Sequence, residues 1–328
     1  MNEQQKEQLR QILLDLYGLD INEANSRFST QNYAFIFPGQ PHMIRVNMAQ
    51  RSSEQILGEL MWLEDLNAEY ATVCEPSPSL HGNLLEEFVL DGKICRASMF
   101  RTARGTPITV PRMSRMFFVC AGNLLGKIHK TSEKQVKAGK KYRRPQQPEN
   151  FTNLKKAVWN NLDPALQARI EEIEAKVFSH DRDPEYFGLC HCDFHLNNFF
   201  VENNNIWLYD FDGCSYGYYL YDIAIFVMAC ISNGYRLGEN CVETVRQYIL
   251  PYFMMGYELE KECGPHFWDD VELFMTYRAC FSFMMLARMG ENAPPVVARW
   301  RNFYSHVLQQ DDILEALSEA SRLYLQEK

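Results

Sequence analysis

The sequence lacks the features that would place the protein in a membrane or outside the cell. No stretch reaches the ~18 uninterrupted apolar residues that a membrane-spanning helix requires. The first seven residues are polar and charged, which is the opposite of an export signal. The ten cysteines are scattered, without the spacing of a disulfide framework. We therefore expect a cytoplasmic protein with reduced thiols and no membrane partner.

Basic residues are outnumbered by acidic ones, 33 Lys and Arg against 42 Asp and Glu, which gives a formal net charge of −9. An acidic surface repels phosphate backbones, so we expect no nucleic-acid partner. The cysteine spacing of a structural zinc site is also missing, because Cys190 and Cys192 have no clear second, distant pair. Zinc chemistry is therefore not expected.

The length of 328 residues exceeds what one hydrophobic core usually supports, so two lobes are expected. Residues 1–100 alternate helical and strand-like patterns, with hairpin turns at Pro38–Pro41 and Asp91–Gly92. The helices and strands expected in this region are 6–17, 33–37, 42–46, 53–70, 84–90 and 93–100. They describe a small β-rich lobe.

The remaining residues, 101–328, are expected to form a mainly helical lobe. Its expected helices are 113–130, 152–178, 219–232, 240–258, 268–289 and 295–325. The basic stretch from Lys134 to Arg144 is interpreted as a solvated linker. The fold class predicted is α+β, with a β-rich N-terminal lobe and a helical C-terminal lobe.

One segment, residues 191–212, carries the groups expected at a phosphoryl-transfer centre. Its middle predicts a β-hairpin with the polar turn Glu202–Asn205. In that hairpin Asn198 and Asp210 are expected side by side, within the ~5 Å of directly paired residues, and Asp193 lies in the loop that leads there. Asn and Asp oxygens suit Mg²⁺, and a free carboxylate beside them can accept the proton of an attacking hydroxyl.

Here the chain resembles a known family. The pattern His-x-Asp-x-His-x-x-Asn, which begins at His191 and is followed twelve residues later by Asp210, is similar to the signature of aminoglycoside phosphotransferases. That superfamily also includes choline kinases, fructosamine kinases and homoserine-kinase-like proteins. Leu124–His129 resembles the family's helix ending in Leu-x-x-[Leu/Ile]-His, and Asp222–Ala224 matches its Asp-[Ile/Leu]-Ala. The family usually has Gly where this chain has Cys192, and Asp222 is interpreted as a structural anchor.

The resemblance extends over nearly the whole chain and implies a bilobal protein-kinase-like fold. It implies that Asp193 is the catalytic base and that Asn198 and Asp210 bind Mg²⁺. It also implies that His191 braces the catalytic loop. For Asp212, support of the metal and structural anchoring both remain open.

Kinases of this fold hold the α- and β-phosphates with a cation on the third strand, and a glutamate on the next helix orients that cation. Arg45 stands where the family mostly has Lys, and Glu59 lies at the edge of the apolar stripe of the following helix. Arginine can grip phosphate bidentately, but its presence leaves the choice between ATP and GTP open. Ser98 and Phe100 are expected near the adenine. Ser29–Tyr33 occupies the place of the nucleotide-covering loop but lacks glycines.

The sequence therefore predicts an enzyme that uses Mg²⁺ and ATP or GTP to move a γ-phosphate onto a hydroxyl of a small molecule. Aminoglycoside-like, amino-alcohol, sugar and homoserine-like acceptors remain open, as does the oligomeric state. Asp269, Asp270 and Glu272 could meet a cationic acceptor, although solvated acids on a helix also explain them.

Two other functions are weighed against this one. A Ser/Thr protein kinase of the same fold is disfavoured because no Ala-Pro-Glu and no long activation segment follow Asp210. A non-catalytic nucleotide-binding pseudokinase is supported only by Arg45 and the glycine-poor loop. The complete set of Asp193, Asn198 and Asp210 argues against it.

Overall fold

The chain forms two compact units in the computed structural model. The N-terminal unit comprises Met1–Thr106 together with two later segments, Lys141–Arg144 and Trp207–Asp212. The C-terminal unit comprises Pro107–Lys140, Pro145–Ile206 and Gly213–Lys328. The structure describes residues 2–28, 32–48, 51–69, 72–108, 113–232, 241–263, 267–290 and 293–324.

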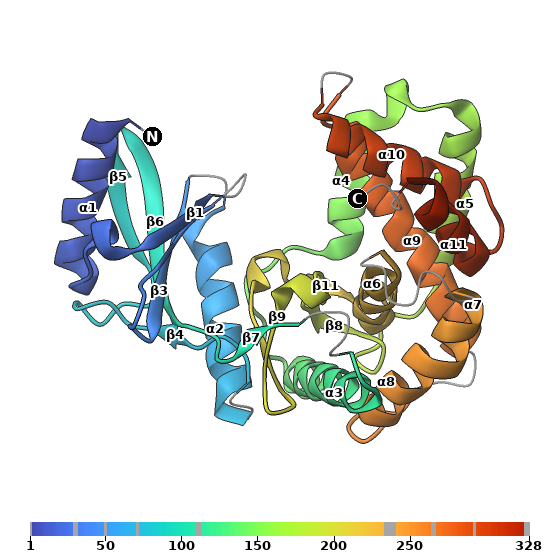
Figure 1. Ribbon diagram of the computed structural model, residues 1–328, viewed down its shortest axis with the longest axis horizontal. Coiled ribbons are helices and arrows are strands. Elements are labelled where there is room, and N and C mark those ends of the chain that lie inside the picture. Colours follow the sequence, from blue (N-terminus) through green and yellow to red (C-terminus); the bar gives the residue numbers. More distant parts are fainter. Residues whose placement is uncertain are drawn as a thin grey trace. The chain divides into compact units, whose positions relative to one another are not determined.

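An antiparallel sheet forms the centre of the N-terminal unit. Its strand order is β1-β2-β3-β6-β4, and β5 pairs with β6. The strands are β1 (Asn25–Phe28), β2 (Asn32–Ile36), β3 (His42–Asn47), β4 (Pro76–Ser77), β5 (Glu86–Leu90) and β6 (Lys93–Arg101). The helices are α1 (Glu3–Tyr17) and α2 (Ser53–Glu69), which lie on opposite sides of the sheet (Figure 1).

The two faces of this sheet are covered differently. On one face, Leu9 and Leu13 of α1 are buried in the cluster that contains Ile44 and Val46 of β3. The residue between these two, Arg45, is also buried, and it ion-pairs with Glu59 of α2. Because successive side chains of a strand point to opposite faces, β3 carries apolar residues toward α1 and a cation toward α2.

The two later segments pack on α2. Tyr142 donates a hydrogen bond to Asp65, and the backbone of Arg143 comes so close to Gly58 that a Cβ there would lie 2.8 Å from the Arg143 carbonyl oxygen. In the other segment, Leu208 bridges to Val73, and the Phe211 ring meets Trp62 edge-on at 5.4 Å. Distant parts of the sequence thereby complete this unit.

Helices dominate the C-terminal unit. Strands β8 (Phe187–Cys190) and β11 (Ser215–Tyr218) pair in antiparallel fashion. Strand β9 (Phe199–Glu202) neighbours β10 (Asn205–Leu208), whose last two residues belong to the N-terminal unit. A short strand, β7 (Thr106–Pro107), pairs with β9. The helices are α3 (Arg115–Lys137), α4 (Gln147–Val158), α5 (Pro164–Phe178), α6 (Tyr219–Ser232), α7 (Cys241–Thr244), α8 (Leu250–Tyr257), α9 (Phe267–Ala287), α10 (Pro295–Leu308) and α11 (Ile313–Tyr324). A π-helical turn, Val245–Ile249, joins α7 to α8.

The α3 and α8 helices are in close contact because each has a glycine where they meet. A Cβ at Gly122 would lie 1.8 Å from the carbonyl oxygen of Phe253, and one at Gly256 would lie 1.9 Å from that of Val119. Side chains cannot be accommodated at these distances. The two glycines therefore set the separation of the helices.

The α+β class predicted from the sequence is confirmed, and so is the hairpin of residues 199–208. Asn203 and Asn204 both have positive φ, as the two-residue turns of hairpins require. The single helix predicted over 152–178 is wrong. The structure has two helices here, because Pro164 begins α5 and the Asp163 side chain caps its N-terminus.

Two further expectations need correction. The helix predicted over 295–325 is also divided, since α10 ends at Leu308 and α11 begins at Ile313. The basic stretch 134–144 is not a solvated linker throughout. Its first residues extend α3 to Lys137, and the Arg144 side chain is fully buried. Among the described residues, none of the helices combines the length and the hydrophobicity that a transmembrane span requires.

Candidate active site

A buried ion pair connects the sheet of the N-terminal unit to α2. Arg45 donates to both carboxylate oxygens of Glu59, at 2.8 and 2.9 Å. The Glu59 side chain is completely buried and that of Arg45 is 8% exposed. A bidentate guanidinium–carboxylate pair of this kind has a fixed geometry, and it holds the Glu59 carboxylate in the interior of the unit.

Further carboxylates face the same guanidinium. Burial alone would lower the pKa of Arg45, but the negative charges of Glu59 and Asp212 raise it above its usual value. Asp210 contributes in the same direction. Asp210 has φ 64°, a left-handed conformation that Asp adopts more readily than most residues.

Ser98 and Phe100 lie beside Arg45 on the neighbouring strand. Ser98 is the register partner of Arg45, and the Arg45 guanidinium lies 4.8 Å from the centre of the Phe100 ring. Both residues are buried. Among the residues that the structure describes, the Ser98 hydroxyl and Arg45 Nε have no hydrogen-bond partner, so polar atoms are left for a ligand on this face.

Arg144 is a site residue that the sequence interpretation missed. Its guanidinium donates to the backbone carbonyls of Gln55 at 2.8 Å and Asp212 at 2.5 Å, and lies 3.9 Å from Glu59. Arg51 pairs with one Asp212 oxygen at 3.2 Å. The other Asp212 oxygen is buried without a partner among the described residues, which is a feature expected of a cation ligand.

The loop that contains Asp193, predicted to be the catalytic loop, runs from β8 to β9 in the C-terminal unit. The Asp193 carboxylate is 35% exposed and lies 3.0 Å from His195 Nε2. It also accepts a hydrogen bond from the Asn198 amide nitrogen at 3.2 Å. Burial would raise the pKa of Asp193, but the hydrogen bond from His195 and the positive charge of the nearby Arg278 lower it overall. Asp193 is thus held as a carboxylate. Because Asn198 uses its nitrogen here, its oxygen is the atom left for a metal ion.

Asp222, at the start of α6, anchors this loop as predicted. Its two oxygens accept hydrogen bonds from the backbone N–H groups of His191 at 2.8 Å and Cys192 at 2.7 Å. Cys192 has φ 61°, where a non-glycine residue costs about 1–2 kcal/mol. Glycine is usual at this position in the resembling family, and the hydrogen bond to Asp222 helps to hold the strained backbone. The His191 ring accepts a hydrogen bond from the Asp193 N–H at 3.1 Å and so contacts the backbone of this loop.

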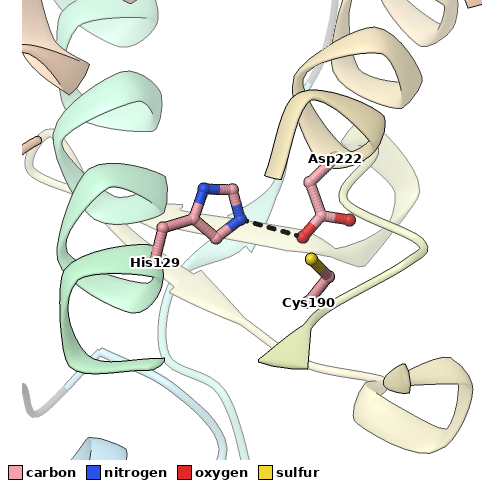
Figure 2. A group of neighbouring side chains, drawn as sticks. All are labelled: His129, Cys190 and Asp222. Atoms are coloured by element: carbon pink, nitrogen blue, oxygen red, sulfur yellow. Dashed lines mark hydrogen bonds and ion pairs between the residues drawn. The ribbon is translucent and has the colours of Figure 1, made fainter. Parts of the chain in front are cut away.

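Behind the loop, His129, Cys190 and Asp222 form a buried cluster whose ligand atoms lie within 4.8 Å of one another (Figure 2). Burial lowers the pKa of His129, so the ring is neutral. Its Nε2–H then donates to Asp222 at 3.2 Å, and its Nδ1 accepts from the Tyr257 hydroxyl at 2.9 Å. Burial also raises the pKa of the Cys190 thiol well above its usual range. The cluster therefore supports the loop and is a poor metal site, because its donors are committed or protonated.

Arg278 of α9 is a second residue that the sequence interpretation missed. Its Nη2 lies 3.5 Å from Asp193 Oδ1. A lone arginine within the apolar run Tyr277–Phe281 was a signal that could have identified it, since buried arginines usually have a specific partner. Arg144 had no such signal, because it ends a run of basic residues.

Other residues predicted from the sequence are not among those described around Arg45 and Asp193. Asp270 contacts His180 at 3.2 Å and Glu272 contacts Arg246 at 2.6 Å, as solvated or paired acids on a helix would. Most of the predicted nucleotide-covering loop, residues 29–31, lies outside the described residues.

Comparison with known proteins gives consistent matches. The model of a family described as "Phosphotransferase enzyme family" matches residues 20–250. Amicoumacin kinase of Bacillus subtilis (strain 168) is 22% identical over 297 residues, which cover 87% of this chain and 88% of that protein. A solved amicoumacin kinase in complex with AMP-PNP, Ca²⁺ and Ami has a TM-score of 0.80 at 20% identity, covering 95% of each chain. A microcompartment-associated aminopropanol kinase has a TM-score of 0.70 at 18% identity, covering 94% of this chain and 99% of that one. The predicted kinase-like fold is thereby confirmed.

Proposed function

The chain belongs to the phosphotransferase enzyme family, and from that membership we propose that it moves the γ-phosphate of ATP or GTP onto a hydroxyl of an aminoglycoside-like, amino-alcohol-like or homoserine-like acceptor. It is a small-molecule phosphotransferase, as the sequence predicted. Relatives named for amicoumacin and aminopropanol support an acceptor that carries both hydroxyl and amino groups. The free cysteines of the described residues, several of them buried thiols, support a cytoplasmic location.

Asp193 carries this proposal. Its carboxylate is partly exposed, negatively charged and oriented by His195 and Asn198, which are the properties a catalytic base needs. It would accept the proton of the acceptor hydroxyl as the hydroxyl oxygen bonds to the γ-phosphorus. The bond from that phosphorus to the β–γ bridging oxygen breaks, and the nucleoside diphosphate leaves.

Several of the residues described above fit a nucleotide and a divalent cation. Arg45, oriented by Glu59, would hold the α- and β-phosphates, and Ser98 and Phe100 would face the adenine side. Asn198 and Asp210 would hold Mg²⁺, which neutralises phosphate charge when bound. The unpaired buried oxygen of Asp212 supports a cation nearby.

The experiment is a turnover assay with purified protein, Mg²⁺ and ATP or GTP. Acceptors are aminoglycosides, amino alcohols, homoserine and sugars, and a generic protein substrate tests the Ser/Thr kinase alternative. We expect acceptor-dependent release of nucleoside diphosphate that falls by at least about 100-fold in Asp193→Ala, because a general base contributes 10²–10⁴-fold. Asn198→Ala should raise the Mg²⁺ concentration needed for activity.

The matched control is Asn197→Ala, an exposed neighbour in the same loop, which should keep its activity. Full activity of Asp193→Ala would remove the assigned base. No turnover and no nucleotide binding by the wild-type protein would favour a non-catalytic role instead.

A further inference from the structure

Arg278 lies on α9 with its guanidinium directed at the proposed base. Its Nη2 is 3.5 Å from Asp193 Oδ1, and the two side chains are 21% and 35% exposed. Both side chains are therefore partly accessible to solvent. An acceptor hydroxyl that bonds to Asp193 Oδ1 must lie within about 6 Å of Arg278 Nη2, given normal hydrogen-bond lengths.

The orientation of Arg278 is set by neighbours that are not acids. Its Nη1 donates to the Tyr221 hydroxyl at 3.1 Å. The guanidinium carbon lies 5.8 Å from the ring centres of both Tyr221 and Phe281. A guanidinium held in this way loses little conformational entropy when it binds a ligand.

The contact with Asp193 does not resemble the structural ion pair of this chain. Arg45 and Glu59 are joined by two short hydrogen bonds in a buried environment. Arg278 reaches Asp193 through one long contact, and no other carboxylate within the described ranges pairs with it. Its two hydrogen-bonded contacts with described residues leave most of its five N–H donors for a ligand.

We propose that Arg278 binds a carboxylate of the acceptor, so that the enzyme prefers hydroxyl compounds that carry a carboxylate near the phosphorylated oxygen. This inference rests on the proposed function and narrows its acceptor class. A planar carboxylate matches the two-pronged geometry of guanidinium, and the resulting hydrogen bonds are charge-assisted. An acceptor ammonium at the same place would instead be repelled.

The test measures acceptors in matched pairs that differ only by a carboxylate. The pairs are homoserine with 3-aminopropan-1-ol, threonine with 1-aminopropan-2-ol, and serine with 2-aminoethanol. Affinity is measured by calorimetry with Mg²⁺ and a non-hydrolysable nucleotide, and KM and kcat by turnover. The wild-type protein should bind the carboxylate member of at least one pair about 10- to 100-fold more tightly, as expected for hydrogen bonds to a charged group.

Arg278→Gln should abolish this preference, so that both members of each pair bind with similar affinity. Tyr221→Phe, which removes the hydroxyl that orients the guanidinium, should weaken the preference partially. The matched control is Arg246→Gln. Arg246 is exposed and pairs with Glu272 of α9, the helix that carries Arg278, and this variant should behave as wild type. Unfolding curves of each variant exclude loss of structure as the cause.

Three results would overturn the inference: equal affinity within every pair, preference for the amino-alcohol members, or no binding of any carboxylate member. Retention of the full carboxylate preference in Arg278→Gln would also overturn it, because another group would then bind the carboxylate. Failure of the wild-type protein to turn over nucleotide with any acceptor would refute the proposed function. The binding measurement would still decide the role of Arg278.

Discussion

Replacing Glu59 with alanine leaves the Arg45 guanidinium buried without its bidentate partner. At a charge separation of about 4 Å and an effective dielectric constant near 20, the pair is worth about 4 kcal/mol before desolvation costs. Measured losses on breaking a buried pair are about 3–5 kcal/mol. With exposures of 0% and 8%, water cannot replace the lost carboxylate. We expect the N-terminal unit to lose about 3 kcal/mol of unfolding free energy, because Asp210 and Asp212 compensate part of the charge.

Two controls separate this effect from general damage to α2. Glu54→Ala removes an ion pair on the same helix, but there the side chains of Glu54 and Arg143 are 70% and 77% exposed. Such a pair contributes about 0–1 kcal/mol. The double variant Arg45→Met with Glu59→Leu removes both charges, so it should be less destabilised than Glu59→Ala alone.

The assay is hydrogen exchange followed by mass spectrometry on peptides that cover β3 and α2, because it reports on the N-terminal unit separately. Urea unfolding of the whole protein supplies the total free energy. If Glu59→Ala loses less than about 1 kcal/mol, or if the double variant loses as much as the single one, the charge argument is wrong.

Two other substitutions probe the C-terminal unit. Gly122→Ala places a Cβ 1.8 Å from the Phe253 carbonyl oxygen, so α3 and α8 must separate. We expect a loss of about 3 kcal/mol of unfolding free energy in thermal or urea unfolding, and a wild-type melting temperature would contradict this. Asp222→Asn replaces an acceptor oxygen with an amide nitrogen opposite a backbone N–H, which costs about 1–3 kcal/mol and loosens the catalytic loop. Its kcat should fall while nucleotide affinity stays unchanged, and equal losses in both would show a general folding defect.

The catalytic loop could be predicted from the sequence because its chemistry is local. Asp193 and Asn198 lie five residues apart, and the turn residues Asn203 and Asn204 identify the hairpin that follows. The Arg45–Glu59 pair could also be predicted, since strand and helix periodicity place both residues on facing surfaces. These are patterns that repeat over two to four residues.

Arg144 and Arg278 could not be assigned in the same way, because their roles depend on long-range contacts. Arg144 meets the Gln55 and Asp212 carbonyls, which lie 89 and 68 residues away. Arg278 meets Asp193 at a separation of 85 residues. Nothing in the local sequence pattern distinguishes the buried Arg144 from the solvated basic residues that precede it.

The chain order of the N-terminal unit has a consequence for biosynthesis. Its first 106 residues leave the ribosome well before the segment Trp207–Asp212, which bridges to Val73 and covers Trp62. At 5–20 residues per second, the delay is about 5–20 s. During that interval the apolar surface of α2 around Trp62 lacks its native cover on the nascent chain, which makes it a surface for chaperones to bind. Most of the C-terminal unit is synthesised later still. The N-terminal unit therefore cannot complete its folding before synthesis of the C-terminal unit has begun.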